Sequence, residues 1–268
     1  MLLRFPSLAA TLVLALVAMA PRASAGGKIS NNERDARAAL KEASALSEQA
    51  KTLIGDRCRW EVTLVKASET LKRAEILLAN APKADPALKR QLTKLAAAIA
   101  EQERDRRLLE QLEAIRLQTS ARKDGQARPQ YAAAFREYGL PLEELDAAKA
   151  AARLREQPSP VREAVLAALD HLALLLDDKA GKRLRDVLAA ADPDPWRTRL
   201  REALGKRDQA SLKKLASDLD LTQQTPAAVI LLADGLVATG ATSEAVAVLR
   251  KAHQLWPADF WLNHRLAQ

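Results

Sequence analysis

Apolar residues recur every three or four positions along almost the whole chain after residue 30, and charged residues fill the positions between them. This spacing is typical of amphipathic α-helices, whereas a strand would alternate with a period of two. It predicts long helices at 31–54, 58–80 and 87–120, followed by shorter helical segments at 131–139, 142–155, 161–176, 184–191, 195–218 and 226–257. The fold class is therefore predicted to be all-α.

The three long helices form an N-terminal group. A short turn at Gly55 and Asp56 joins the first two, so that their apolar stripes can face each other as a helical hairpin. The third helix begins with the alternating spacing of a coiled-coil seam, which Gln102 and Arg106 then interrupt. Two interpretations fit: a coiled coil over 87–120, or a helix that packs at both ends and crosses solvent in the middle.

The clearest predicted loop, residues 123–129, divides the chain. It separates an N-terminal helical arm, partly coiled-coil-like, at 28–125 from a body of shorter helices at 128–268. Within the body, Gly139 is a helix stop signal, and Asp194 is placed to cap a helix that begins at Pro195.

The end of the body matches the pattern of a tetratricopeptide repeat over 226–257, followed by a half-repeat at 258–268. Small and apolar residues stand where the two helices of that repeat meet: Leu232, Ala233, Leu236, Gly240, Ala245, Leu249 and Ala252, with Pro257 closing the unit. Residues 195–218 read as a similar helix–turn–helix unit. The body is therefore predicted to be an α-solenoid stack that ends in tetratricopeptide-like helix pairs, an architecture that binds partners.

An aromatic and polar group near the C-terminus is the candidate partner-binding surface: Trp256, Phe260, Trp261, Asn263 and His264. Trp256 and Phe260 could instead fill the seam between successive repeats. In the binding interpretation, an apolar face on the last helix is covered by a protein or peptide partner, or by a second copy of the chain. Self-association through 87–120 is a further option.

Charge and chemistry narrow the function classes. The net charge is +8, but acids and bases are interleaved and only 3% of residues are aromatic, which argues against a nucleic-acid surface. The histidines lack metal-ligand spacing. The paired carboxylates fall at predicted helix ends or loops, where capping and solvation explain them: Glu143 and Glu144, Asp177 and Asp178, and Asp192 and Asp194. We expect no catalytic residue, cofactor, metal or small-molecule substrate.

The first 25 residues have the pattern of a secretory signal peptide. Arg4 precedes an apolar run at 8–20, and an Ala-Ser-Ala site at 23–25 follows. Cleavage there would export the chain to the periplasm or cell envelope, whereas an uncleaved segment over 5–20 would anchor it to the membrane. Cys58 is the only cysteine, so no internal disulfide can form, and we expect a half-buried residue near a helix start.

Three phrases occur in order along the chain: AAFREYGL at 133–140, DPDPWR with LREAL over 192–204, and ADFWLNH at 258–264. Together they resemble the tetratricopeptide-containing region that follows the kinase domain in planctomycete-type bacterial serine/threonine kinases, over roughly residues 58–268. The kinase domain itself has no counterpart here, because the Gly-rich loop, His-Arg-Asp and Asp-Phe-Gly motifs are missing from the sequence. The resemblance therefore implies no kinase activity and carries over no catalytic residue.

These observations favour a non-catalytic, exported tetratricopeptide-like scaffold that mediates protein–protein interaction. The alternative is the sensory or regulatory portion of a split or truncated serine/threonine kinase system, without kinase activity of its own. Both readings predict a protein or peptide partner whose identity the sequence does not specify.

Overall fold

The computed structural model describes residues 30–121, 126–141, 146–176 and 178–268. Over these ranges the chain forms helices joined by turns, with no strand, which confirms the all-α prediction. The predicted signal peptide at 1–25 lies outside the described residues, as do residues 123–125 of the predicted loop. None of the described helices is long and apolar enough to cross a membrane.

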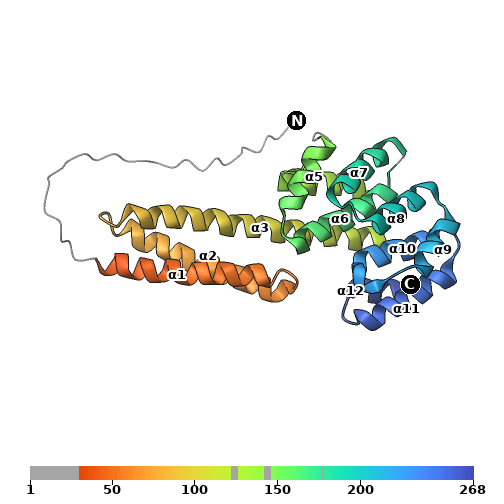
Figure 1. The fold of residues 1–268 in the computed structure, drawn as a ribbon. Helices are drawn as coiled ribbons and strands as arrows, with labels where there is room; N and C mark the ends of the chain where they lie inside the picture. Colours follow the sequence, from red (N-terminus) through yellow and green to blue (C-terminus); the bar gives the residue numbers. More distant parts are fainter. Residues whose placement is uncertain (1–29, 122–125, 142–145, 177) are drawn as a thin grey trace, which may run out of the picture.

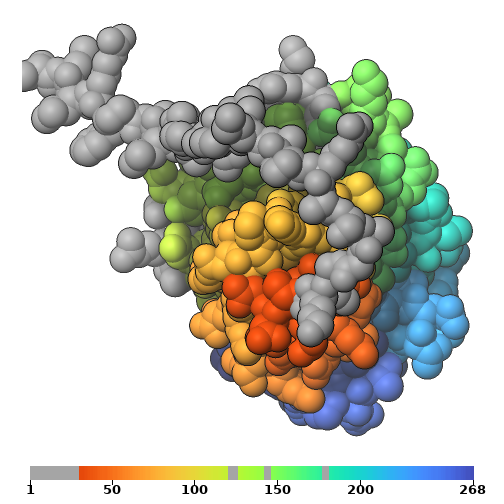
Figure 2. Space-filling view, turned by 90° about the vertical axis from the view of Figure 1, so that its left-hand side faces the viewer, coloured from red at the N-terminus to blue at the C-terminus, as the bar shows by residue number. Residues whose placement is uncertain are grey.

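Three helices form the arm. α1 (Asn31–Thr52) and α2 (Arg57–Ala79) are an antiparallel hairpin, and α3 (Pro86–Ala121) runs back along both of them and continues into the body (Figure 1). Figure 2 looks onto the outer end of the arm, where α1, α2 and α3 pack side by side in front of the body. The long third helix is thus shared by the two parts of the molecule.

The body consists of the remaining helices, most of them paired with the next along the chain. They are α4 (Ala127–Tyr138), α5 (Ala147–Glu156), α6 (Ser159–Leu174), α7 (Asp178–Ala191), α8 (Pro195–Lys206), α9 (Gln209–Ser217), the 3-10 turn η1 (Leu221–Gln223), α10 (Pro226–Ala238), α11 (Thr242–Leu255) and α12 (Phe260–Leu266). α6 packs on α7, α8 on α9 and α10 on α11, while α12 follows α11 (Figure 1). This succession of pairs is compatible with the predicted solenoid.

Local sequence signals set the helix boundaries. Asp194 accepts a hydrogen bond from the backbone N–H of Arg197, and Pro195 occupies the first helical position of α8, as predicted. Gly139 and Gly240 end α4 and α10 with φ angles of +89° and +84°, a backbone region that glycine enters without strain. Asp208 and Asp259 cap α9 and α12 in the same way as Asp194.

Buried apolar residues form four clusters that divide the molecule. The arm core lies among α1, α2 and the first half of α3. A joint core, which includes Trp60, Leu109 and Val161, connects the arm to α6. One body core spans the second half of α3 and α4 to α7, and the other spans α8 to α12. Packing therefore continues along α3 from the arm to the body, past the division expected at 123–129.

The interpretation of α3 as a helix that crosses solvent in its middle is wrong. Gln102 and Asp105 are only 6% and 3% exposed. The Gln102 side-chain amide donates to Ser47 Oγ over 2.8 Å, and the Tyr138 hydroxyl donates to the Asp105 carboxylate over 2.6 Å. Polar residues interrupt the apolar seam because they bond to α1 on one side and to α4 on the other. A second small correction concerns Cys58, which is exposed and not half-buried.

Candidate functional site

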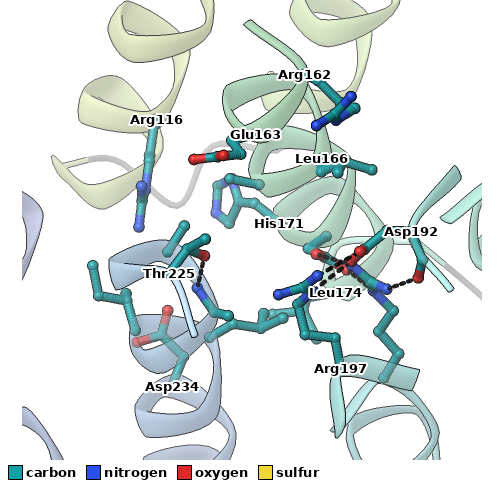
Figure 3. A pocket seen from close by; sticks show the side chains of 17 residues that line it. Arg116, Arg162, Glu163, Leu166, His171, Leu174, Asp192, Arg197, Thr225 and Asp234 are labelled. Carbon is teal, nitrogen blue, oxygen red and sulfur yellow. Dashed lines mark hydrogen bonds and ion pairs between the residues drawn. The ribbon is translucent and has the colours of Figure 1, made fainter. Parts of the chain in front are cut away.

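A cleft of about 270 Å³ lies between α3, α6, α8 and α10 (Figure 3). It opens where the two body cores meet, and the first helices of successive pairs form its walls. Charged and apolar side chains alternate around it: Arg116, Arg162, Glu163, Leu166, Asp170, His171, Leu174, Asp192, Arg197, Arg201, Leu231 and Asp234. Such a lining offers hydrogen-bond donors, acceptors and apolar contacts within one concavity.

The floor of the cleft is a network of four charged residues. Arg201 donates to both carboxylate oxygens of Asp170, over 2.8 and 3.0 Å, and to Asp192 over 2.8 Å. Arg197 binds Asp192 with two further hydrogen bonds of 2.6 and 2.7 Å. Because Asp170 lies on α6 and Arg201 on α8, the network joins the two body cores through their polar boundary.

The electrostatics of this network favour the charged forms of Arg197, Arg201 and Asp192, whereas burial raises the pKa of Asp170 in spite of its bonds from Arg201. Burial tends to lower the pKa of Arg201, but hydrogen bonds and charges from Asp170 and Asp192 outweigh it and raise the pKa. Burial likewise tends to raise the pKa of Asp192, but the bonds from Arg197 and Arg201 hold it below its ordinary value. The Asp192 carboxylate is therefore a poor proton acceptor at neutral pH, and the bonds between Asp170 and Arg201 connect α6 to α8.

Arg116 closes one side of the cleft. It projects from the last turns of α3, and its guanidinium carbon lies 4.0 Å from the ring centroid of Trp261 on α12. Asp234 on α10 lies across the cleft from it in Figure 3 and pairs with Arg265 at 2.7 Å. Arg116 thus brings the end of the arm's long helix against the C-terminal helix of the body.

His171 is part of the wall and is held by Tyr131. The hydroxyl of Tyr131 and Nδ1 of His171 share a hydrogen bond of 2.9 Å. Burial and the positive charges of Arg116 and Arg265 lower the pKa of His171 to about 4, so the ring is neutral at physiological pH. His171 is thus a histidine on the face of α6 whose hydrogen bond is satisfied by Tyr131.

The residues predicted for partner binding lie beside the cleft, and the structure gives them different environments. Trp261 is half-buried under Arg116, and Trp256 is half-buried against the core of α8 to α12. Phe260 is 54% exposed and contacts the rings of Trp261 and His264, with centroids 5.2 and 5.9 Å away. Asn263 donates to the backbone carbonyl of Pro257, a contact that holds the preceding turn.

The alternative that Trp256 and Phe260 both fill a seam is thus supported for Trp256 only. Leu262, which is fully buried, anchors α12 to the rest of the body. Phe260 remains the exposed member of the group, with Trp261 and His264 supporting its ring.

Comparison with known proteins identified no relative of this chain. The chain matches no protein-family model, no curated protein and no solved structure. The candidate site therefore rests on its own geometry. Among the described residues, no three or more His, Cys, Asp or Glu side chains gather where they could hold a metal ion.

Sequence reasoning missed most of the cleft. It interpreted Asp192 as a capping or solvated residue, whereas the Asp192 carboxylate lies in the buried network. One available signal was Asp170, a carboxylate in the second half of the apolar helix α6, where a buried partner would stabilise it. Its partner Arg201, 31 positions later, has no sequence signal of its own.

Proposed function

We propose that the protein is a non-catalytic scaffold whose body holds a peptide segment of a partner protein in the cleft between α3, α6, α8 and α10. One observation carries the proposal: α6, α8 and α10, the first helices of successive pairs, surround a concavity that contains both charged and apolar groups. Tetratricopeptide-like stacks bind extended segments on the surface formed by their first helices, and the helix pairs at 195–217 and 226–255 fit that pattern.

The rim of the cleft indicates the kind of segment that would fit. Arg162 and Glu163 stand near each other on α6, and Leu174, which is 43% exposed, lies further along the same helix. An apolar side chain of the partner would contact Leu174 and Leu231, while the partner's backbone and charged groups would meet the rim. Phe260 extends the apolar surface beyond Trp261. The signal-peptide pattern at residues 1–25 supports an interaction in the periplasm or cell envelope.

The proposal can be tested with two matched variants. Leu174→Lys puts a charge on the apolar wall of the cleft, and Val62→Lys puts the same charge on α2 of the arm, where Val62 is 53% exposed. Cell-envelope proteins captured by the purified wild-type protein would be identified by quantitative mass spectrometry, and direct binding would be measured with the purified partner. Circular dichroism would check that each variant is folded.

We expect the Val62→Lys variant to bind the same partner as the wild type and the Leu174→Lys variant to bind it at least about tenfold more weakly. Phe260→Ala would weaken binding as well if the aromatic group contacts the same segment. Equal binding by the two lysine variants would show that the cleft is not the binding surface.

A further inference from the structure

A second concave surface lies on the arm, away from the cleft. It is a groove of about 990 Å³ between α1 and the first half of α3. Its lining comes from two helix faces: Arg37, Leu40, Lys41, Ser44, Ala45, Glu48 and Lys51 on α1, and Leu88, Gln91, Lys94, Leu95 and Ala98 on α3. Both helices run along the length of the arm (Figure 1), and side chains of both line the groove.

The groove exists because small side chains stand where the helices face each other. α1 directs its most buried residues, such as Ala36, Ala43 and Ala50, into the arm. Ser44 and Ala45 remain exposed on the groove side, and Ala98 stands opposite on α3. The half-buried Leu95 and the buried Leu40 and Leu88 form an apolar base. The result is a shallow apolar channel parallel to the helices.

Basic residues border this channel. Four of its lining residues carry a positive charge and one, Glu48, carries a negative charge. Glu48 pairs with Lys51 at 2.7 Å, and Arg37 pairs with Glu33 at 3.0 Å. Lys41 and Lys94 have no ion-pair partner within the part of the chain that the structure describes. Two unpaired lysines therefore stand on opposite sides of an apolar channel, one on each helix.

We propose that the groove between α1 and α3 is a docking site for one acidic amphipathic helix of a partner protein. The stretch from Arg37 to Lys51 is about 21 Å long at 1.5 Å per residue, which matches a helix of about four turns. The apolar face of that helix would lie on Ala45, Leu95 and Ala98, above the buried Leu40 and Leu88. Its acidic flanks would pair with Lys41 and Lys94, so that charge fixes both the partner and its orientation.

The positive charge of the groove also favours an acidic partner helix over two other possible occupants, a second copy of the chain and residues 1–29 of the same chain. A second copy that docked through the same groove would bring two basic borders together, which is unfavourable for a two-fold symmetric contact. The sequence of residues 1–29 contains Arg4, Arg22 and Lys28 and no acidic residue, so it carries the same sign of charge as the groove. An acidic helix from another protein satisfies both the apolar base and the basic border. This inference is independent of the cleft in the body.

The test uses the purified protein and two synthetic, fluorescently labelled peptides of about 16 residues, each with a Leu and Ala face. One carries Glu at the remaining positions and the other carries Lys. Binding is followed by fluorescence anisotropy. The protein variants are Lys41→Glu/Lys94→Glu, the control Lys72→Glu on the exposed face of α2, and Ala45→Trp and Ser44→Trp, which fill the groove from an exposed position. Circular dichroism shows that each remains helical.

We expect the Glu peptide to bind and the Lys peptide not to bind. The double charge reversal should weaken binding about tenfold or more, and Lys72→Glu should not. At least one of the two tryptophan variants should block binding, and added salt should weaken it. The proposal is overturned if the Glu peptide does not bind, if both peptides bind alike, or if the double reversal has no more effect than Lys72→Glu. It is also overturned if sedimentation reveals a dimer that the tryptophan variants dissociate, because the occupant is then a second copy.

Discussion

At the scale of single residues, the body depends on a few charged groups placed at the boundary between its two cores. The Arg201 side chain is 7% exposed and that of its partner Asp170 is 12% exposed. In contrast, Lys182 and Asp186 on α7 form an ion pair whose side chains are 74% and 53% exposed. Burial decides how much the loss of one partner lowers stability. A charge left without its partner is solvated at the surface, but it is strongly unfavourable in the interior.

We therefore expect Asp170→Ala to lower the free energy of unfolding by about 3 kcal/mol, since it leaves Arg201 buried with only Asp192 as a partner. Asp186→Ala, the matched control on an exposed pair, should change it by less than about 0.5 kcal/mol. Urea denaturation measures both. The double variant Asp170→Leu/Arg201→Leu should recover part of the loss, because no unpaired charge then remains on α8. Equal losses from Asp170→Ala and Asp186→Ala would contradict a buried network.

Because the pKa of His171 is lowered in the folded chain, we expect the free energy of unfolding to depend on pH. Its pKa is lowered from 6.5 to about 4 in the folded chain, so the unfolded chain binds more protons between these values. The stabilisation is therefore complete above pH 6.5 and is lost as the pH falls toward 4. The contribution of His171 to this loss between pH 6.5 and 5 should be about 1.5 kcal/mol.

The comparison variant for this prediction is His171→Gln, which cannot titrate. Its free energy of unfolding, measured by urea denaturation at several pH values, should vary less over the same window than that of the wild type. Parallel curves for the two proteins would show that His171 is not the group responsible.

At the scale of elements, the close approach of α8 and α10 depends on a glycine. A Cβ atom built on Gly235 would lie 2.3 Å from Leu204 Cδ2 and 3.3 Å from Leu212 Cδ1. Gly205, near the end of α8, has only Arg185 side-chain atoms near it, at 4.0 Å. Two helical glycines thus differ in whether a methyl group has room.

Gly235→Ala should lower the free energy of unfolding by about 1–3 kcal/mol, because Leu204 and Leu212 must move to admit the methyl group. Gly205→Ala should leave it unchanged or raise it by up to about 1 kcal/mol, because alanine favours the helix. Thermal and urea unfolding of both variants, measured together, separate the packing effect from the helix propensity that they share. A destabilised Gly205→Ala variant, or a Gly235→Ala variant as stable as the wild type, would contradict this reading.

Sequence periodicity predicted the elements well and their ends less well. The predicted helix at 87–120 is α3, and the predicted unit at 195–218 is α8 with α9. The predicted helices at 131–139 and 184–191 begin earlier in the structure. Pro129 lies in the first turn of α4, where a backbone N–H has no partner within the helix and its absence costs nothing. Gly181 lies inside α7. The predicted starts were too late because positions assigned to loops, which include this proline and this glycine, belong to the helices.

The candidate site was less predictable because its residues come from distant segments. The aromatic group at 256–264 is local in sequence and could be found by inspection. The cleft joins Arg116, Asp170, Arg201 and Asp234, and only the packing of α3, α6, α8 and α10 brings them together. Periodicity indicates which face of a helix is buried, but not which distant charge that face will meet.

At the scale of the whole molecule, α3 makes the arm and the body one structure. Its first half belongs to the arm core, and Leu108, Leu112 and Ile115 in its second half belong to the body core. Between them, Gln102 bonds to the arm and Asp105 to Tyr138 of the body. If either part unfolded alone, it would expose apolar surface on α3 and break one of these buried bonds, so we expect the two parts to unfold together.

The fluorescence of Trp60 and Trp196 can follow the unfolding of two different parts of the molecule. Trp60 is 1% exposed in the joint core, and Trp196 belongs to the core of α8 to α12. In two single-tryptophan variants, one retaining Trp60 and the other Trp196, urea unfolding followed by fluorescence should give the same midpoint and slope, and circular dichroism should agree.

The link can be weakened in each single-tryptophan background by Tyr138→Phe, which leaves the buried Asp105 carboxylate without its hydroxyl donor. Burial raises the pKa of Asp105 even with that bond present, so its loss should lower stability by about 1–3 kcal/mol near neutral pH. Both midpoints should then fall together, because the lost bond joins the two parts. If only the Trp60 midpoint fell, or if it already preceded that of Trp196 in the parent variants, the arm would be an independent unit. α3 would then connect the arm and the body without coupling their stability.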